Sequence, residues 1–287
     1  MTALSFDALP HLPQCDLLKE IAPTLWQQES VRALWVGGSL ARGEADRYSD
    51  IDLRMAVAPE TLEAWKRPDF GMLFHGLCLT EQLLSFGEGA FLHHLLLRNG
   101  DIYDLWVQSA EQAPSAEAIL ILGCRDAALR ERLEQTAPLP PTPYPLAEKQ
   151  TVRALLEGFW INSHKHRKVL HRNLHLLALT GVQADRAVLQ RLWYIQATGR
   201  DYGATRTETI HGLTERTRTV EKAQGARALE ILGADLSSHE HICRALERIR
   251  EEVSTVGLDL ALTLDFDYPH ALEETVQRCW AEYLGGW

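Results

Sequence analysis

Two acidic side chains, Asp50 and Asp52, stand two positions apart in a segment with the pattern of a β-strand. From Asp50 to Val57 polar and apolar residues alternate, which predicts that Asp50, Asp52 and Arg54 share one face. Two carboxylates so close repel each other, and a bound cation normally offsets that cost. Mg²⁺ is held by one or two carboxylates and completed by water and phosphate oxygens, so it is the ion that we expect here.

A glycine-serine turn precedes these acids. Residues 31–36 (VRALWV) predict a short buried strand, which ends in a turn that contains Gly38 and Ser39. Glycine lets backbone amides approach an anion, and the Ser39 hydroxyl adds a donor. Residues 40–42 predict a short helix whose N-terminus points at the phosphates, and Arg42 is a candidate phosphate contact, although an exposed helix-end arginine is commoner. The turn therefore predicts a polyphosphate site beside the metal site.

Other phosphate-binding signatures fail on particular residues. From Gly38 the chain reads GSLARGEA, so Glu44 and Ala45 stand where a Walker A loop needs Lys followed by Ser or Thr. No GxGxxG motif follows a strand, and the HRD and DFG elements of a protein kinase are missing. These three alternatives are therefore excluded.

The segment GSLARGEADRYSDID resembles the signature of the polymerase-β-type nucleotidyltransferase superfamily, and within it the lincosamide and aminoglycoside nucleotidyltransferases. The residues that carry the resemblance are Gly38, Ser39, Gly43, Asp46, Ser49, Asp50 and Asp52. The resemblance implies transfer of a nucleoside monophosphate from a nucleoside triphosphate, with ATP as the expected donor and two Mg²⁺ ions. The acceptor would be a hydroxyl group of a small molecule such as an antibiotic, and pyrophosphate would be released.

The resemblance also implies a third carboxylate on a neighbouring strand, which completes the metal site or acts as the base. Residues 91–98 and 101–108 predict a β-hairpin. In its second strand Asp104 shares a face with Ile102 and Trp106, so it is an acid among apolar neighbours. Such a placement favours use as a general base. We therefore expect Asp50, Asp52 and Asp104 to form the catalytic and metal-binding set.

Several of these acids have a plainer alternative. Asp101 rivals Asp104 as the third acid, but it lies beside the hairpin turn and is more typical of a cap. Asp104 itself could instead form an ion pair with a base such as Arg98. Asp46 and Ser49 fit turn and cap residues better than ligands, because both readily bond nearby backbone amides.

Length and composition agree with an enzyme that acts on small molecules. The chain has 287 residues and a formal net charge of −10, whereas a protein that binds duplex nucleic acid needs basic surface. An acidic surface suits a cationic acceptor. The five cysteines are isolated, and neither a leader peptide nor a membrane-length apolar run is present, which predicts a cytoplasmic protein. A homodimer whose chains share a cleft is left open.

The proline-rich stretch at residues 136–146 divides the chain. Residues 1–136 mix strands with helices, and residues 147–287 show helical periodicity almost throughout, beginning with apolar residues that recur from Val152 to Leu177. We therefore expect an α+β fold, with an N-terminal mixed-sheet nucleotidyltransferase domain followed by a C-terminal helical bundle. This order is that of the antibiotic-modifying enzymes, and the resemblance implies a cleft between the two parts.

The first predicted helix after the connector has a basic stripe. Lys165, Lys168 and Arg172 recur at helical spacing, beside a stripe of histidines that runs from His164 to His175. If this face turns toward the cleft, Lys165 and Lys168 would contact the triphosphate and the departing pyrophosphate; a solvated basic surface is the alternative. Trp160, Trp193 and Tyr194 could supply an aromatic wall for the base or the acceptor, although such residues more often belong to the core.

Two other functions remain open at this point. In toxin-antitoxin systems a nucleotidyltransferase that modifies protein or RNA is paired with a helical RNase module that carries an Arg and a His a few residues apart, and Arg206 with His211 offers that spacing. Against it, Thr207 stands where a polar amide or an acid is usual. A non-catalytic nucleotide sensor is less consistent with the sequence, because sensors often lose the acids that are kept here.

Overall fold

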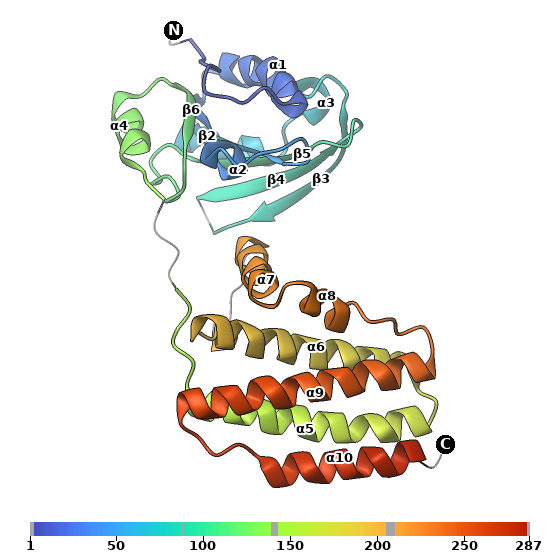
Figure 1. The fold of residues 1–287 in the computed structure, drawn as a ribbon. Coiled ribbons are helices and arrows are strands. Elements are labelled where there is room, and N and C mark those ends of the chain that lie inside the picture. Colours follow the sequence, from blue (N-terminus) through green and yellow to red (C-terminus); the bar gives the residue numbers. More distant parts are fainter. Residues whose placement is uncertain (1–2, 88, 139–142, 205–209, 286–287) are drawn as a thin grey trace. The chain divides into compact units, whose positions relative to one another are not determined.

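The computed structural model describes residues 3–87, 89–138, 143–204 and 210–285. It divides into two compact units, residues 1–141 and 142–287, and the division falls within the proline-rich stretch (Figure 1). The first unit contains a six-stranded sheet with helices, and the second is helical. The predicted α+β fold class is therefore confirmed. No helix in the described ranges combines the length and the hydrophobicity needed to cross a bilayer.

The N-terminal unit is built around a sheet of strand order β3-β4-β5-β2-β1-β6. Its elements are α1 (Pro13–Gln27), β1 (Val31–Val36), α2 (Gly38–Arg42), β2 (Ile51–Val57), η1 (Pro59–Lys66), α3 (Phe70–Leu73), β3 (Cys78–Ser85), β4 (Ala90–Leu97), β5 (Ile102–Ser109), β6 (Leu120–Cys124) and α4 (Ala127–Gln135). All neighbouring strands pair antiparallel except β2 and β5, which are parallel. A parallel pair needs a crossover, and the segment from η1 to β4 supplies it.

The two faces of the sheet differ in what covers them. Ile51, Leu53 and Met55 of β2 are fully buried in a core that includes residues of α1, η1 and α3, and Figure 1 shows α1 on this side. On the opposite face α4 packs over β1 and β6. Between these covered regions, β2 presents Asp52 and Arg54, which are only half-buried. The period-2 pattern thus places the acids on the face away from the main core.

Strand β3 was not predicted from the sequence. It lies at one edge of the sheet and pairs only with β4, in the described part of the unit. Almost all of its residues are exposed. Because neither face of this strand is buried, its sequence shows no regular alternation of polar and apolar residues. The hairpin of β4 and β5, by contrast, forms where its pattern predicted.

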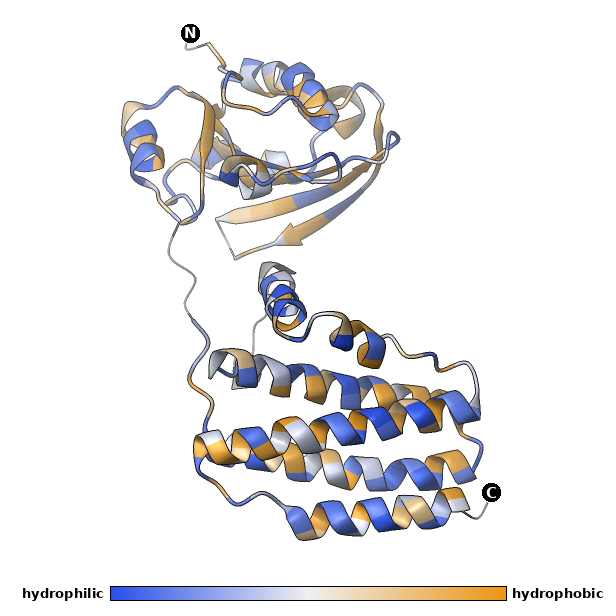
Figure 2. Ribbon diagram, viewed as in Figure 1, coloured by the Kyte–Doolittle hydropathy of each residue, from blue (hydrophilic) through white to orange (hydrophobic). Residues whose placement is uncertain are grey.

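The C-terminal unit consists of helices. They are α5 (Lys149–His171), α6 (His175–Thr198), η2 (Tyr202–Ala204), α7 (Ile210–Gln224), α8 (Ala226–Leu232), α9 (His239–Leu264) and α10 (His270–Gly285). Figure 2 shows hydrophobic and hydrophilic bands alternating along α5, α6 and α9, as expected for helices with one buried face. Their buried residues form a single core that includes Phe159, Trp193 and Trp280.

One helical prediction needs correction. The apolar spacing from Val152 continues through Leu174 and Leu177, but α5 ends at His171 and α6 begins at His175. Asn173 adopts a φ of 55°, a left-handed conformation that ends a helix and that Asn tolerates better than most residues. Leu174 and Leu177 are exposed, so the apolar residues before and after Asn173 do not form one continuous buried stripe. The predicted basic stripe consequently ends with α5, and His175 belongs to another helix.

A buried ion pair fastens the segment after α6. Arg191 donates two hydrogen bonds to the carboxylate of Asp201, at 2.7 and 2.6 Å, and the Gly203 N–H donates a third at 2.9 Å. Burial alone would raise the pKa of Asp201, but these bonds outweigh it and hold the pKa below its ordinary value. Asp201 also donates its backbone N–H to Pro145 O, so the pair connects the start of this unit to α6.

We expect Asp201→Asn to destabilise the helical unit by about 3 kcal/mol, because it leaves the Arg191 charge buried without its counter-charge. The pKa of Asp201 is lowered in the folded state. Its contribution to the free energy of unfolding is therefore fully present above the unfolded-state pKa of about 4, and is lost as the pH falls through the folded-state pKa. Urea unfolding followed by circular dichroism measures it. Glu157→Gln removes an exposed pair with Arg153 and serves as the control; equal effects of the two variants would contradict the prediction.

Candidate active site

The parallel pairing of β2 with β5 brings the predicted carboxylates together. Asp52 lies directly opposite Asp104 in the register, and Asp50 immediately precedes β2. The side chains of Asp52 and Asp104 are 26% and 24% exposed, so both are partly buried yet open to a ligand. The three acids predicted from sequence therefore belong to one region of one sheet face.

The carboxylates affect one another electrostatically. Desolvation raises the pKa of Asp52, the Arg54 guanidinium opposes this, and the charges of Asp104, Glu117 and Asp50 add to the rise. Asp50 is exposed as a residue, but desolvation of its carboxyl group and the Asp104 charge raise its pKa as well. Mutual repulsion of this kind favours a bound cation.

Gly38 touches Asp52 so closely that a side chain cannot fit. It begins α2 with a φ of +60°, and a Cβ atom there would stand 1.8 Å from Asp52 Oδ2. The Gly37 N–H donates to Asp52 O at 2.9 Å, which fixes the turn to β2. The predicted anion-binding turn and the predicted metal-binding acid thus contact each other directly.

We expect Gly38→Ala to reduce pyrophosphate release at least 100-fold, because the added Cβ displaces the Asp52 carboxylate. The matched control is Gly43→Ala. Gly43 also has a positive φ, of 72°, but a Cβ there meets nothing within 4 Å. Both variants incur a backbone cost of about 1 kcal/mol, which thermal unfolding measures; activity losses of similar size in the two would contradict the prediction.

The loop before β2 is held by hydrogen bonds that position Asp50. Asp46 Oδ1 accepts from Tyr48 N at 2.8 Å, and Ser49 Oγ accepts from Asp46 N at 2.9 Å. Gln14 at the start of α1 donates to the carbonyl oxygens of Asp46 and Ser49. Asp46 and Ser49 are therefore turn residues, in agreement with the plainer alternative given by the sequence. Asp101 likewise bonds with Asn99 at its turn.

Glu117 is a site residue that sequence analysis missed. Arg54 Nε donates to Glu117 Oε1 at 3.0 Å, and Arg54 Nη2 donates to Glu117 Oε2 at 3.3 Å and to Asp52 Oδ1 at 3.5 Å. A Cβ on Gly37 would stand 2.9 Å from the Glu117 carboxylate. Arg54 thus bridges two acids and restrains Asp52. Glu117 follows β5 by several residues in a loop, and nothing in its local sequence marks it.

His94 is the partner of Asp104. The two lie opposite each other on β4 and β5, and His94 Nδ1 donates to Asp104 Oδ1 at 2.5 Å. The plainer alternative from sequence was a pair of Asp104 with Arg98 or another base, and the structure gives His94 as that base. The adjacent His93 faces the core and is fully buried, so only one of two neighbouring histidines reaches the site. The hairpin register, once known, identifies His94.

The donor chemistry fits a hard divalent cation. Asp50, Asp52 and Asp104 offer carboxylate oxygens, the ligands that Mg²⁺ prefers. Within the described residues, no three Asp, Glu, His or Cys side chains already converge on one point. Mg²⁺ needs only one or two protein carboxylates when phosphate and water complete its shell, so Asp50 and Asp52 suffice as the protein part of such a site.

We expect Asp50→Asn to stabilise the metal-free N-terminal unit slightly at neutral pH, by at most about 0.5 kcal/mol because solvent screens an exposed carboxylate. The pKa of Asp50 is raised in the folded state. Ionised Asp50 therefore destabilises the fold above its folded-state pKa, and this cost vanishes below its unfolded-state pKa. Thermal unfolding in EDTA at pH 8 and pH 5 measures this, and the gain should shrink at the lower pH. Asp16→Asn, at an exposed site, is the control; a destabilised Asp50→Asn at pH 8 would refute the electrostatic account.

The remaining predicted contacts are described within the unit to which each belongs. Arg42 ends α2, and its Nε donates to Glu44 Oε2 at 2.9 Å. Lys165 and Lys168 line a groove of about 520 Å³ on α5 whose other lining residues are also basic, namely His164, Arg167, His171 and Arg172. Trp160 and Trp193 are fully buried and Tyr194 is nearly so, which agrees with the plainer alternative of core residues and not with an aromatic wall. The Arg206 and His211 pair lies outside the residues whose side chains the structure describes.

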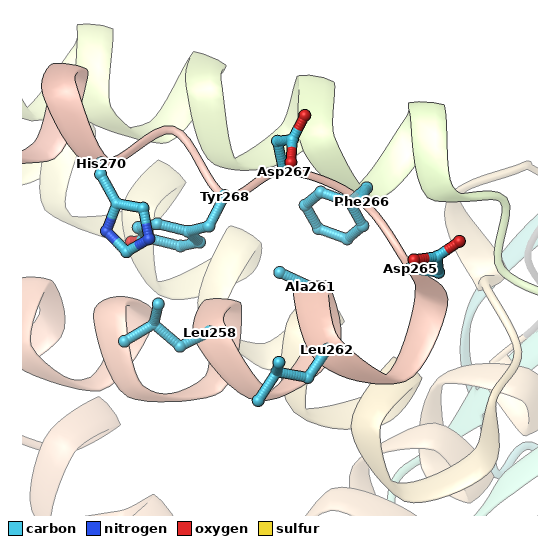
Figure 3. Close-up of a pocket in the computed structure, with 8 residues that line it drawn as sticks. All are labelled: Leu258, Ala261, Leu262, Asp265, Phe266, Asp267, Tyr268 and His270. Atoms are coloured by element: carbon cyan, nitrogen blue, oxygen red, sulfur yellow. The ribbon is translucent and has the colours of Figure 1, made fainter.

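A second groove of the helical unit, of about 600 Å³, lies between the end of α9 and the segment that leads into α10 (Figure 3). Leu258 and Leu262 line it together with Phe266, Tyr268 and His270. Asp265 and Asp267 lie beside these rings. This groove contains neither the glycine turn nor the strand-borne acids, so we do not assign the transfer chemistry to it.

Comparison with known proteins gave a match to a family model and a distant structural likeness. Residues 15–116 match the sequence model of a nucleotidyltransferase domain, and this range contains the glycine turn and all three predicted carboxylates. The superfamily resemblance is thus confirmed for this part of the chain. Comparison with curated proteins gave no significant match. The solved structure of an aminoglycoside 6-adenyltransferase from Bacillus subtilis is similar at a TM-score of 0.40 and 15% identity, over 94% of this chain and 97% of that chain; so distant a likeness supports no inference about the acceptor.

Proposed function

Because residues 15–116 match a nucleotidyltransferase domain, we propose that this protein transfers a nucleoside monophosphate from a nucleoside triphosphate to a hydroxyl group of a small molecule. The observation that carries the proposal is the placement of Asp52 opposite Asp104, with Gly38 packed against the Asp52 carboxylate. The β2–β5 pair would thereby offer acidic ligands and a base, and the turn between β1 and α2 would bind the anion. ATP is the expected donor, and an aminoglycoside or a lincosamide is the expected acceptor class.

Each residue has a role that its environment supports. Asp50 and Asp52 would hold Mg²⁺, which neutralises charge on the triphosphate when bound. Gly38 and Ser39 would bind the phosphate tail through backbone amides and a hydroxyl. Asp104 would accept the proton of the acceptor hydroxyl, whose oxygen attacks the α-phosphorus in line with the departing pyrophosphate.

Basic residues would balance the charge of the leaving group. Arg42 stands at the end of α2, close in sequence to the glycine turn, and can exchange Glu44 for a phosphate oxygen. Lys165 and Lys168 belong to a groove lined by basic side chains only, which suits a polyanion such as the triphosphate.

The test of this proposal removes first the metal ion and then one carboxylate. With Mg²⁺, labelled nucleotides and a panel of aminoglycosides and lincosamides, the wild-type protein should release pyrophosphate and add the mass of one nucleotide to an acceptor. EDTA should abolish this. Asp52→Asn should lower turnover at least 100-fold while changing the melting temperature little, because catalysis here rests on positioning and charge neutralisation.

Asp16→Asn serves as the control for an acid outside the site. Full pyrophosphate release by Asp52→Asn would sink the proposal. Release of RNA fragments that survives Asp52→Asn would favour the toxin-antitoxin alternative.

A further inference from the structure

The open face of the sheet carries two parallel rows of side chains across four strands. The first row is polar and consists of Asp52, Asp104, His94 and Gln82, each opposite the next in the register of β2, β5, β4 and β3. The second row lies two residues along and consists of Arg54, Trp106, Leu92 and Leu84. Two residues of a strand span about 7 Å, so one small molecule can touch both rows.

Trp106 is the centre of the second row. The Phe86 ring lies 5.0 Å from the Trp106 ring, tilted by 39°, and Arg54 Cζ lies 5.7 Å from it. Trp106 Nε1 donates to Gln108 Oε1 at 3.0 Å, which fixes the orientation of the indole. Together Trp106, Phe86, Leu92 and Leu84 form what we call the apolar shelf.

The apolar shelf stays in contact with solvent. Phe86 is 51% exposed and Leu84 is 37% exposed, while Trp106 and Leu92 are half-buried. Large apolar side chains that are grouped and exposed beside polar groups are typical of binding sites. Figure 2 shows β3 and β4 as mostly hydrophobic arrows interrupted by hydrophilic bands. The sequence of β4 contains two histidines, and the second, His94, is the partner of Asp104 in the polar row.

The charges around the apolar shelf limit the class of ligand that it can bind. Asp50, Asp52, Asp104 and Glu117 face this region. The nearest cation, Arg54, is already bound by Asp52 and Glu117. An anionic ring would therefore be repelled, whereas a neutral or cationic ring would not.

We propose that the apolar shelf binds a ring of the acceptor, which is accordingly a cyclic, neutral or cationic compound with one flat apolar face and a hydroxyl group that reaches Asp104. This inference rests on the proposed function and deepens it by naming the acceptor class and the residues that select it. Trp106 and Phe86 supply the stacking surface. Leu84 and Leu92 extend it away from the carboxylates.

Leu83 and Leu84 provide a matched pair for the test. They are adjacent in β3 and 39% and 37% exposed, but successive residues of a strand point to opposite faces, so only Leu84 belongs to the apolar shelf. With kanamycin or lincomycin as the acceptor, Leu84→Ala should raise the acceptor KM about fivefold and Trp106→Ala at least tenfold. Leu83→Ala should leave it unchanged, and Trp106→Phe should restore part of the affinity. The nucleotide KM should not change in any of them.

A binding readout separates this inference from the proposed function. With 5-fluorotryptophan incorporated, the Trp106 signal in ¹⁹F NMR, assigned from Trp106→Phe, should shift with kanamycin or lincomycin but not with sorbitol, an acyclic polyol. A shift without nucleotide transfer would refute the proposed function and keep the ring site. Transfer with equal KM values for Leu83→Ala and Leu84→Ala would overturn the ring site alone.

Two further outcomes overturn the inference. One is the absence of any Trp106 shift with either ring compound. The other is a loss of thermal stability in Trp106→Ala with no change in acceptor KM, which would show that another part of this chain covers the apolar shelf.

Discussion

Asp52 and Asp104 come together only because β2 and β5 run parallel and side by side in one register. A shift of one residue would turn one of the two carboxylates into the core, where Leu53 and Leu105 now lie fully buried. The buried leucines that follow the two acids therefore fix the register of β2 against β5. The chemistry of the site thus depends on the packing of the opposite face, where α1 and η1 cover the sheet.

The same arrangement places like charges close together at a cost in stability. Arg54 limits this cost by bridging Asp52 and Glu117, and His94 does so for Asp104. These two partners compensate the acids without occupying the glycine turn. The structure thus restrains Asp52 and Asp104 through side chains of the sheet itself.

Much of the fold and of the candidate site was predictable from local sequence patterns, and the features that were not predicted have physical causes. Alternation located β2 and the β4–β5 hairpin, and the glycine turn with Asp50 and Asp52 predicted the nucleotidyltransferase domain that residues 15–116 match. Glu117 could not be found, because it reaches Arg54 across 63 positions of sequence from a loop without periodicity. Edge strand β3 lacks a buried face and so lacks a pattern. In the helical unit, periodicity found the helices but did not reveal the left-handed Asn173 that separates α5 from α6.

The contact between Gly38 and Asp52 has a thermodynamic consequence. In the proposed function this turn meets the phosphate tail and this carboxylate meets the ion, so a shift in either one would move the other. Binding of cation and nucleotide would then be reciprocal, because whatever one contributes to the affinity of the other is returned in equal measure. Cooperative loading of the two ligands would thus follow from the absence of a side chain at Gly38.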